Sequence, residues 1–211
     1  MSKFRNKYRI ESNRWQFWDY SSPGRYFLTI CIQDRKCILG SVFKGKMELS
    51  LLGEIVKNET EKIPEYHRRI QLDEWVIMPN HVHLLIELGE YDHDNGMVCE
   101  GGGAADKIHV DKIHVDKIHE FYLPNTDNTD NRYDINQYRK LRRNMLIPKL
   151  LGKWQMLTSK QMNLLQNTPG QKNWQRDYHD HVIRNEASYL RIKNYIIQNP
   201  SNWDQDTFNR P

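Results

Sequence analysis

The sequence contains no long apolar run, and no stretch of its 211 residues approaches the roughly 18 consecutive apolar residues of a membrane-spanning helix. Polar, basic and aromatic residues follow Met1, so the apolar core of a secretory signal is not apparent. Cysteine is scarce: three residues at irregular spacing are too few for a disulfide framework or a zinc cluster. From these absences we expect a cytoplasmic protein that spans no membrane.

The chain is polar but has the composition of a folded protein. Hydrophobic residues make up 38% of it and aromatic residues 11%, with a mean hydropathy of −0.84. The length suits one domain over residues 1–211 and is sufficient to bury a core. We expect the core of this domain to cover about residues 20–205.

Residues 89–131 differ in composition from the rest of the chain. They hold ten acidic and three basic residues, a net charge of −7, which leaves +11 on the remainder. The five-residue repeat that begins at Asp106 recurs at Asp111 and Asp116. The histidine of each repeat does not indicate a metal site, because this spacing does not bring three ligands together on a helix or strand. Few bulky residues and many glycines predict a disordered acidic insertion.

Hydrophobic periodicity predicts four strands and three helices outside the insertion. The strands are expected at 26–33, 70–78, 81–87 and 174–184, and the helices at 51–63, 136–165 and 186–198. Ser50 is a candidate N-cap, and the second helix is expected to be broken around Pro148. The order β-α-β-β-α-β, followed by a helix, is the split βαβ pattern. It predicts an α+β protein with an antiparallel sheet and helices on one face.

His81 and His83 are the most informative polar pair. Residues two apart on a strand project to the same side, so the two imidazoles are expected side by side. Two imidazoles can bind one divalent cation, although a tight site needs a third ligand. The alternative interpretation is a pair of surface histidines without a metal.

Tyr195 and Asn199 form the second candidate pair. They are four residues apart and lie on one face of the last predicted helix. They flank the apolar stripe of Tyr189, Ile192 and Ile196, so a phenol at position 195 can reach a site on the sheet. The alternative is an amphipathic core tyrosine whose hydroxyl is solvated.

A dense basic stretch follows the insertion. Eight lysine and arginine residues fall between positions 132 and 160 with one acid, Asp134, and with interleaved aromatic residues. Such side chains bind phosphates and stack on unpaired bases, whereas the alternative is a solvated helix face. The candidate nucleic-acid contacts are Arg139, Lys140, Arg142, Arg143, Lys149, Lys153, Tyr178 and His181.

Three segments together carry a family resemblance. They are residues 75–85 (WVIMPNHVHLL), 174–184 (WQRDYHDHVIR) and 195–200 (YIIQNP). In this order and spacing they resemble the single-tyrosine HUH transposases, and most closely the REP-associated tyrosine transposases and related insertion-sequence transposases. The resemblance covers roughly residues 20 to 205 without the insertion.

The resemblance implies a ferredoxin-like palm: a βαββαβ antiparallel sheet with helices on one face, and a C-terminal helix that carries the tyrosine. By position, His81 and His83 become metal ligands and Tyr195 the nucleophile. Asn199 takes the place where relatives have a third polar ligand, which in the insertion-sequence enzymes is glutamine. The implied cofactor is Mg²⁺ or Mn²⁺.

The resemblance also implies an activity, that of a DNA transposase. Such an enzyme cleaves and rejoins single-stranded DNA near a hairpin by metal-assisted transesterification, through a phosphotyrosine intermediate. Insertion-sequence relatives pair as dimers and REP-associated relatives act as monomers, so the sequence leaves a homodimer and a monomer open. Two other functions also stay open: a catalytically idle nucleic-acid-binding module of the same fold, and a metal-dependent phosphodiesterase that uses water.

Overall fold

A four-stranded antiparallel sheet is the centre of the fold in the computed structural model, which describes residues 3–4, 7–8, 18–91, 138 and 140–209. The strands follow the order β6-β7-β3-β8 across the sheet. Their bounds are β3 Gly24–Cys31, β6 Ile70–Met78, β7 His81–Leu88 and β8 His179–Ile183. The predicted α+β class is confirmed, with β6 and β7 joined as the expected hairpin.

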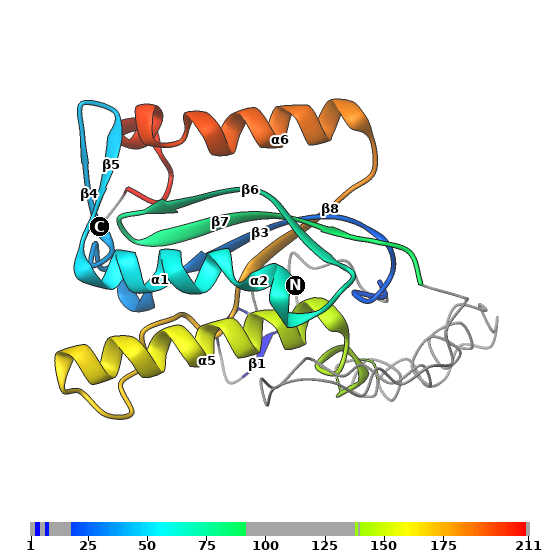
Figure 1. Ribbon diagram of the computed structural model, residues 1–211, viewed down its shortest axis with the longest axis horizontal. Coiled ribbons are helices and arrows are strands. Elements are labelled where there is room, and N and C mark those ends of the chain that lie inside the picture. Colours follow the sequence, from blue (N-terminus) through cyan, green and yellow to red (C-terminus); the bar gives the residue numbers. More distant parts are fainter. Residues whose placement is uncertain (1–2, 5–6, 9–17, 92–137, 139, 210–211) are drawn as a thin grey trace.

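Helices cover both faces of this sheet (Figure 1). On one face lie α1 (Leu51–Glu61), α2 (Ile63–Tyr66) and α5 (Leu146–Gln166), and on the other lies α6 (Glu186–Gln198). Within the described ranges, no helix is both long and apolar enough to cross a membrane. Side chains alternate between the two faces along each strand, and helices lie on both faces, so the sheet has two buried faces.

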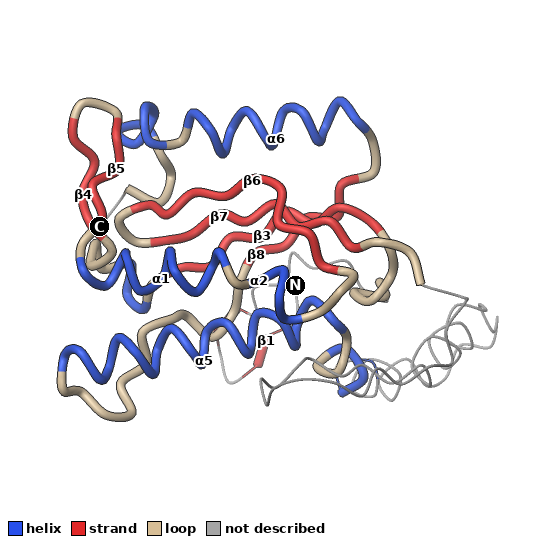
Figure 2. The backbone as a smooth tube through the Cα atoms, in the orientation of Figure 1, coloured by secondary structure: helices blue, strands red, loops and turns tan. Residues whose placement is uncertain are grey.

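Smaller elements complete the described part of the chain, and Figure 2 shows the β4–β5 hairpin beside the sheet. They are β1 Lys3–Phe4, β2 Lys7–Tyr8, β4 Gly40–Phe43, β5 Lys46–Leu49, and the short 3₁₀ helices η1 Gln33–Arg35 and η2 Pro200–Gln205. The β4–β5 hairpin is not among the predicted elements. Its turn uses Lys44 and Gly45, both at positive φ, where glycine is the residue that fits without strain.

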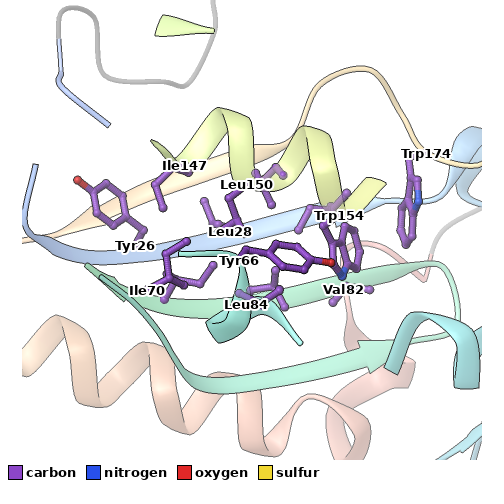
Figure 3. Packing of buried hydrophobic residues seen from close by; sticks show 14 of the residues in the cluster. Tyr26, Leu28, Tyr66, Ile70, Val82, Leu84, Ile147, Leu150, Trp154 and Trp174 are labelled. Carbon is purple, nitrogen blue, oxygen red and sulfur yellow. The ribbon is translucent and has the colours of Figure 1, made fainter. Parts of the chain in front are cut away.

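The larger core lies between the sheet and α1, α2 and α5 (Figure 3). Leu28, Val82 and Leu84 project from the sheet onto this face and are fully buried. Trp154 of α5 packs among them, and its indole N–H donates to the hydroxyl of Thr60 at 3.1 Å. The smaller core on the other face contains Leu85, Ile183 and Ile196, so α6 rests on the side of β7 opposite to Leu84.

Most predicted elements are confirmed to within a few residues. The helix at 186–198 and the strand at 70–78 have the predicted bounds, and Ser50 caps α1 by accepting from the N–H of Gly53 at 3.1 Å. The predicted helix over 136–165 is interrupted at residues 143–145, close to Pro148 as expected. Pro148 itself lies in the first turn of α5, where a backbone N–H has no partner within the helix.

Residues that precede and follow positions 92–137 both contact Ser21. The hydroxyl of Tyr91 donates to the carbonyl of Ser21 at 2.9 Å, and the N–H of Leu146 donates to the Ser21 hydroxyl at 2.9 Å. Arg69 stacks on the Tyr91 ring at 3.7 Å and bonds the carbonyl of Gly89 at 2.9 Å. Residues 89–91 therefore belong with the folded part, while the repeat lies outside the described residues.

We predict that residues 92–131 can be replaced by a short Gly/Ser linker without loss of the fold. Tyr91, before the segment, and Leu146, beyond it, both bond Ser21, and the Tyr91–Arg69 stack remains in the shortened chain. Urea unfolding should stay cooperative, with a midpoint close to that of the full chain. As a control, a second deletion that also removes Tyr91 should lower the midpoint. A broad, non-cooperative transition in the first deletion would show that the segment contributes to the core.

Candidate active site

Two imidazoles meet on the α6 face of the sheet. His81 and His83 both project from β7 to this face, and their Nε2 atoms lie 3.0 Å apart. They are 0% and 1% exposed, respectively. The predicted juxtaposition of the pair is therefore present, but the pair is buried instead of lying on the surface.

Asn80 fixes the tautomer of His81. Its amide Nδ2 donates to the carbonyls of Arg35, at 3.2 Å, and of Phe208, at 2.8 Å. These two acceptors orient the amide so that Oδ1 faces Nδ1 of His81 at 2.8 Å. An amide oxygen only accepts, so Nδ1 of His81 carries the proton and Nε2 keeps its lone pair. That lone pair is directed toward His83.

Thr29 supports the second imidazole. Its hydroxyl lies 2.8 Å from Nδ1 of His83, across the β3–β7 pairing. A hydroxyl both donates and accepts, so it can pair with either tautomer of His83. When it accepts from Nδ1, the Nε2 atoms of both histidines present lone pairs to one point, as a shared cation requires.

Burial keeps both imidazoles neutral. It lowers the pKa of His81 to about 4; Asp206 acts in the opposite sense, and the charge of Arg35 lowers the pKa further. Burial also lowers the pKa of His83 well below its ordinary value, and the neighbouring His81 adds to this. Neutral imidazoles are the form that binds metal ions, so the pair is ready to bind one at neutral pH.

These shifts predict a loss of stability in mild acid. Between pH 6.5 and about 4 the unfolded chain protonates both histidines while the native chain resists, so the unfolded state binds more protons. In this window, without added metal, the free energy of unfolding should fall as the pH falls. The expected slope is about 1.4 kcal/mol per pH unit for each proton taken up. Urea unfolding at a series of pH values measures it.

The matched control for this prediction is His181→Gln, which removes an exposed histidine of β8. It should leave the slope unchanged, whereas the double variant His81→Gln/His83→Gln should flatten it. Equal slopes in the double variant and the unmodified protein would contradict the assignment.

Tyr195 joins the histidine pair from the opposite layer. Its hydroxyl lies 3.2 Å from Nε2 of His83, and its ring meets that of Phe27 edge-on at 6.1 Å. Burial raises the pKa of the phenol, and Asp206 raises it further, while a hydrogen bond from Asn199 lowers it. The side chain is half-buried and the residue is 41% exposed, so the phenol faces both the imidazole and the solvent.

Asn199 and Asp206 lie on the third side of the pair. The Asn199 amide Nδ2 donates to Oδ2 of Asp206 at 3.0 Å, and Asn199 is buried. Candidate ligand atoms of His81, His83 and Asp206 all lie within 4.8 Å of one another. The sequence did not indicate Asp206, because η2 turns the chain back toward the sheet without a repeating pattern.

These donors fit a divalent cation. Two neutral imidazole nitrogens and one carboxylate form a mixed nitrogen and oxygen set that such ions accept. The buried Oδ1 of Asn199 has no hydrogen-bond partner among the described residues, so an additional ligand oxygen is available at the same place. The predicted His81–His83 pair is thus joined by Asp206, and the role predicted for Asn199 stays a prediction.

The C-terminal segment covers the imidazoles. The Phe208 ring packs 4.6 Å from that of His81 and 6.0 Å from that of His83, measured between centroids. Its carbonyl accepts from Asn80, and its N–H donates to Oδ1 of Asp206 at 2.7 Å. The Phe208 ring therefore contributes to the burial of both imidazoles.

A strained turn borders the site next to Phe208. Asp34 and Arg35 of η1 have φ values of 57° and 53°, so both are left-handed. Such backbone costs a residue other than glycine about 1–2 kcal/mol. The Asn80 amide holds the turn through the Arg35 carbonyl, and the Arg35 guanidinium lies 5.4 Å from the centre of the Phe208 ring.

A bulge in β6 anchors the helix that carries Tyr195. The β6–β7 register shifts between Leu72 and Glu74, which leaves Asp73 as the extra residue. Its carboxylate accepts from the hydroxyl of Tyr189 at 2.7 Å and from Nζ of Lys193 at 2.5 Å. Although its partial burial acts in the opposite sense, these hydrogen bonds hold the pKa of Asp73 below its ordinary value.

The predicted nucleic-acid contacts are distributed over both layers. Lys149 and Lys153 belong to α5, on the face of the sheet opposite to α6, and Tyr178 packs against the larger core. His181 is exposed and lies on β8 opposite Phe27, on the α6 face. Lys140, Arg142 and Arg143 precede α5, and Arg139 lies outside the described residues. Their role in binding stays a prediction.

Comparison with known proteins finds similarity both in sequence and in structure. No protein-family model matches the chain. An uncharacterized protein of Haemophilus influenzae strain Rd is 30% identical over 195 residues, which cover 92% of this chain and 90% of that protein.

The two structures are more distant in sequence. A REP associated tyrosine transposase bound to a REP hairpin has a TM-score of 0.41 and 15% identity, covering 96% of this chain and 74% of that one. A candidate transposase from Deinococcus radiodurans R1 has a TM-score of 0.40 and 14% identity, covering 93% of this chain and 96% of that one.

Proposed function

Given that the chain belongs to the family of the uncharacterized Haemophilus influenzae protein, which brings no activity with it, we propose a function from the site itself. The protein is a single-tyrosine transposase that cleaves and rejoins single-stranded DNA. The reaction is a transesterification through a phosphotyrosine, in which Tyr195 is the nucleophile and His81 and His83 are metal ligands.

One observation carries this proposal: a phenol and two neutral imidazoles converge from separate layers. Tyr195 lies on α6 and the two histidines lie on β7. The Tyr195 hydroxyl is 3.2 Å from Nε2 of His83, and Nε2 of His83 is 3.0 Å from Nε2 of His81. A core tyrosine would direct its hydroxyl to a fixed partner away from solvent. A half-exposed phenol beside potential metal ligands has the geometry of a nucleophile next to an electrophilic centre.

The chemistry is a displacement at phosphorus. The Tyr195 oxygen attacks the phosphodiester and forms a new P–O bond while the bond to the leaving sugar oxygen breaks. The phenolic proton passes to solvent, which the exposed side of the ring faces, and the leaving oxygen takes up a proton in return. Since the number of phosphoester bonds is conserved, a DNA hydroxyl can later displace the tyrosine and rejoin strands without ATP.

The two histidines, Asp206 and the free oxygen of Asn199 would hold the cation. When bound, a divalent cation polarises a phosphate oxygen and lowers the barrier to attack. The chain's own contribution is to fix the ligands: Asn80 sets the tautomer of His81, and Thr29 orients His83. Mg²⁺ and Mn²⁺ are the proposed ions.

The substrate class follows from access. The site lies beneath α6 and is covered by Phe208, so a stiff duplex cannot bring its backbone to the imidazoles, whereas an unpaired strand can bend into it. The strand order β6-β7-β3-β8 is also that of the ferredoxin-like palm implied by the sequence resemblance, with α6 added on the open face. We therefore propose single-stranded DNA next to a hairpin as the partner.

The test is a search for a covalent protein–DNA adduct. The full chain is incubated with end-labelled single-stranded DNA that contains a hairpin, with Mn²⁺ or Mg²⁺, and the products are separated on a denaturing gel. The expected result is a labelled band that migrates with the protein and disappears after protease treatment.

The same gel separates the alternatives. Cleaved DNA without an adduct would support a phosphodiesterase that uses water. Binding without cleavage in either metal would support an idle nucleic-acid-binding module.

A further inference from the structure

Arg35 combines three unusual features next to the histidine pair. It stands at a left-handed backbone position in the turn from Gln33 to Lys36, where its φ is 53°. The second central residue of such a turn is ordinarily glycine, because glycine has no side chain to strain the backbone. A long cationic side chain at this position strains the backbone and buries little surface in return, since the residue is exposed.

The guanidinium of Arg35 is not occupied by a carboxylate. Among the described residues, no acidic group lies within ion-pair distance of it, whereas Arg25 has two such partners. The guanidinium lies 5.4 Å from the centre of the Phe208 ring, and the His81 ring lies 4.6 Å from the same ring, measured between centroids. An unpaired cation therefore lies one aromatic ring away from the imidazoles.

The backbone of Arg35 is tied to the site through one side chain. Asn80 donates to the Arg35 carbonyl at 3.2 Å and accepts from Nδ1 of His81 at 2.8 Å. The N–H of Arg35 donates to the carbonyl of Ile32 at 3.0 Å, at the end of β3. The strained turn is thus held in a fixed relation to His81, and strain retained in this way is typical of functional positions.

We propose that Arg35 binds a phosphate oxygen of the single strand, beside the phosphate that Tyr195 attacks. Arginine binds phosphate through parallel N–H donors, and the guanidinium of this exposed residue is accessible to a strand. Movement of the Phe208 ring, which packs on His81, would open the imidazoles beside this cation. The assignment rests on the proposed function, because it takes the substrate to be single-stranded DNA.

The test compares Arg35→Gly with Asp34→Gly. Both changes relieve a left-handed backbone in the same turn, and neither should lower the midpoint of thermal unfolding. Binding of a fluorescein-labelled single-stranded oligonucleotide is followed by anisotropy at several salt concentrations, and the adduct is measured in the same preparations. Arg35→Lys is included to retain the charge without the paired donors.

Arg35→Gly should weaken binding and reduce the slope of log affinity against log salt by about 0.7, the contribution of one phosphate contact on a single strand. Asp34→Gly should keep the slope of the unmodified chain, and Arg35→Lys should keep most of it. Adduct formation by Arg35→Gly should fall with the affinity.

The outcomes separate this assignment from the proposed function. An unchanged slope and affinity in Arg35→Gly, with adduct formed by the unmodified chain, overturns the assignment alone. An Arg35-dependent slope without any adduct supports the phosphate contact and overturns strand cleavage. Lack of binding by the unmodified chain at low salt overturns both.

Discussion

The covalent adduct should disappear in Tyr195→Phe while binding of single-stranded DNA persists. The substitution keeps the ring that packs edge-on against Phe27 and removes the oxygen that lies 3.2 Å from His83. Without that oxygen no phosphotyrosine can form, so the loss should be complete on a denaturing gel. Because the phenol is half-exposed and Nε2 of His83 keeps its contact with Nε2 of His81, the midpoint of thermal unfolding should change little.

The matched control is Tyr189→Phe on the same helix. Its hydroxyl donates to Asp73 rather than facing the histidines, so adduct formation should continue, reduced at most by a loosened helix. If Tyr195→Phe still forms the adduct, the nucleophile is another tyrosine. In that case Tyr189 and Tyr178 are the residues to test next.

Cleavage should fall by at least about a hundredfold when either imidazole is removed, as in His81→Ala or His83→Ala, because each supplies one of few ligands. EDTA should abolish cleavage by the unmodified chain, and Mn²⁺ should restore it. Since both histidines are buried, each alanine variant should also lose about 1–3 kcal/mol of stability. Activity must therefore be measured well below the unfolding temperature of each variant.

The exposed His181 provides the control for this series. His181→Ala removes an imidazole from the same face of the sheet but no proposed metal ligand, so it should bind Mn²⁺ as the unmodified chain does, and any loss of cleavage should follow a loss of DNA binding. Isothermal titration with Mn²⁺ gives a second readout, in which the variants at positions 81 and 83 should lose binding. Undiminished cleavage in EDTA would refute the metal requirement.

Local sequence patterns correctly predicted that His81 and His83 lie side by side. His81 and His83 share a face because the strand period is two, and this parity survives because β7 pairs regularly with β3 along its length. The helix at 186–198 has the predicted bounds because Asn185 caps its start and Pro200 follows its end. Strand periodicity and helix caps depend only on residues that are close in sequence, so both can be recognised in the sequence alone.

Other parts of the site depend on how distant segments meet. Asp206 reaches the histidines through an irregular turn, and Arg35 through a strained one, neither of which has a periodic signature. The bulge at Asp73 has no sequence pattern of its own, although it changes which residues of β6 face α6. The basic residues that are close in sequence do not all lie on one surface. Lys149 and Lys153 belong to α5, which lies on the face of the sheet opposite to the histidine pair.

The bulge at Asp73 has a consequence for how Tyr195 reaches its target. Asp73 fixes the first half of α6 through Tyr189 and Lys193, and the buried side chains of Ile196 and Asn199 fix its end. A helix held at both ends cannot slide or tilt without breaking one set of contacts. The freedom left to the nucleophile is rotation about its two side-chain bonds, so little entropy remains to be lost when the phenol aligns with a phosphate.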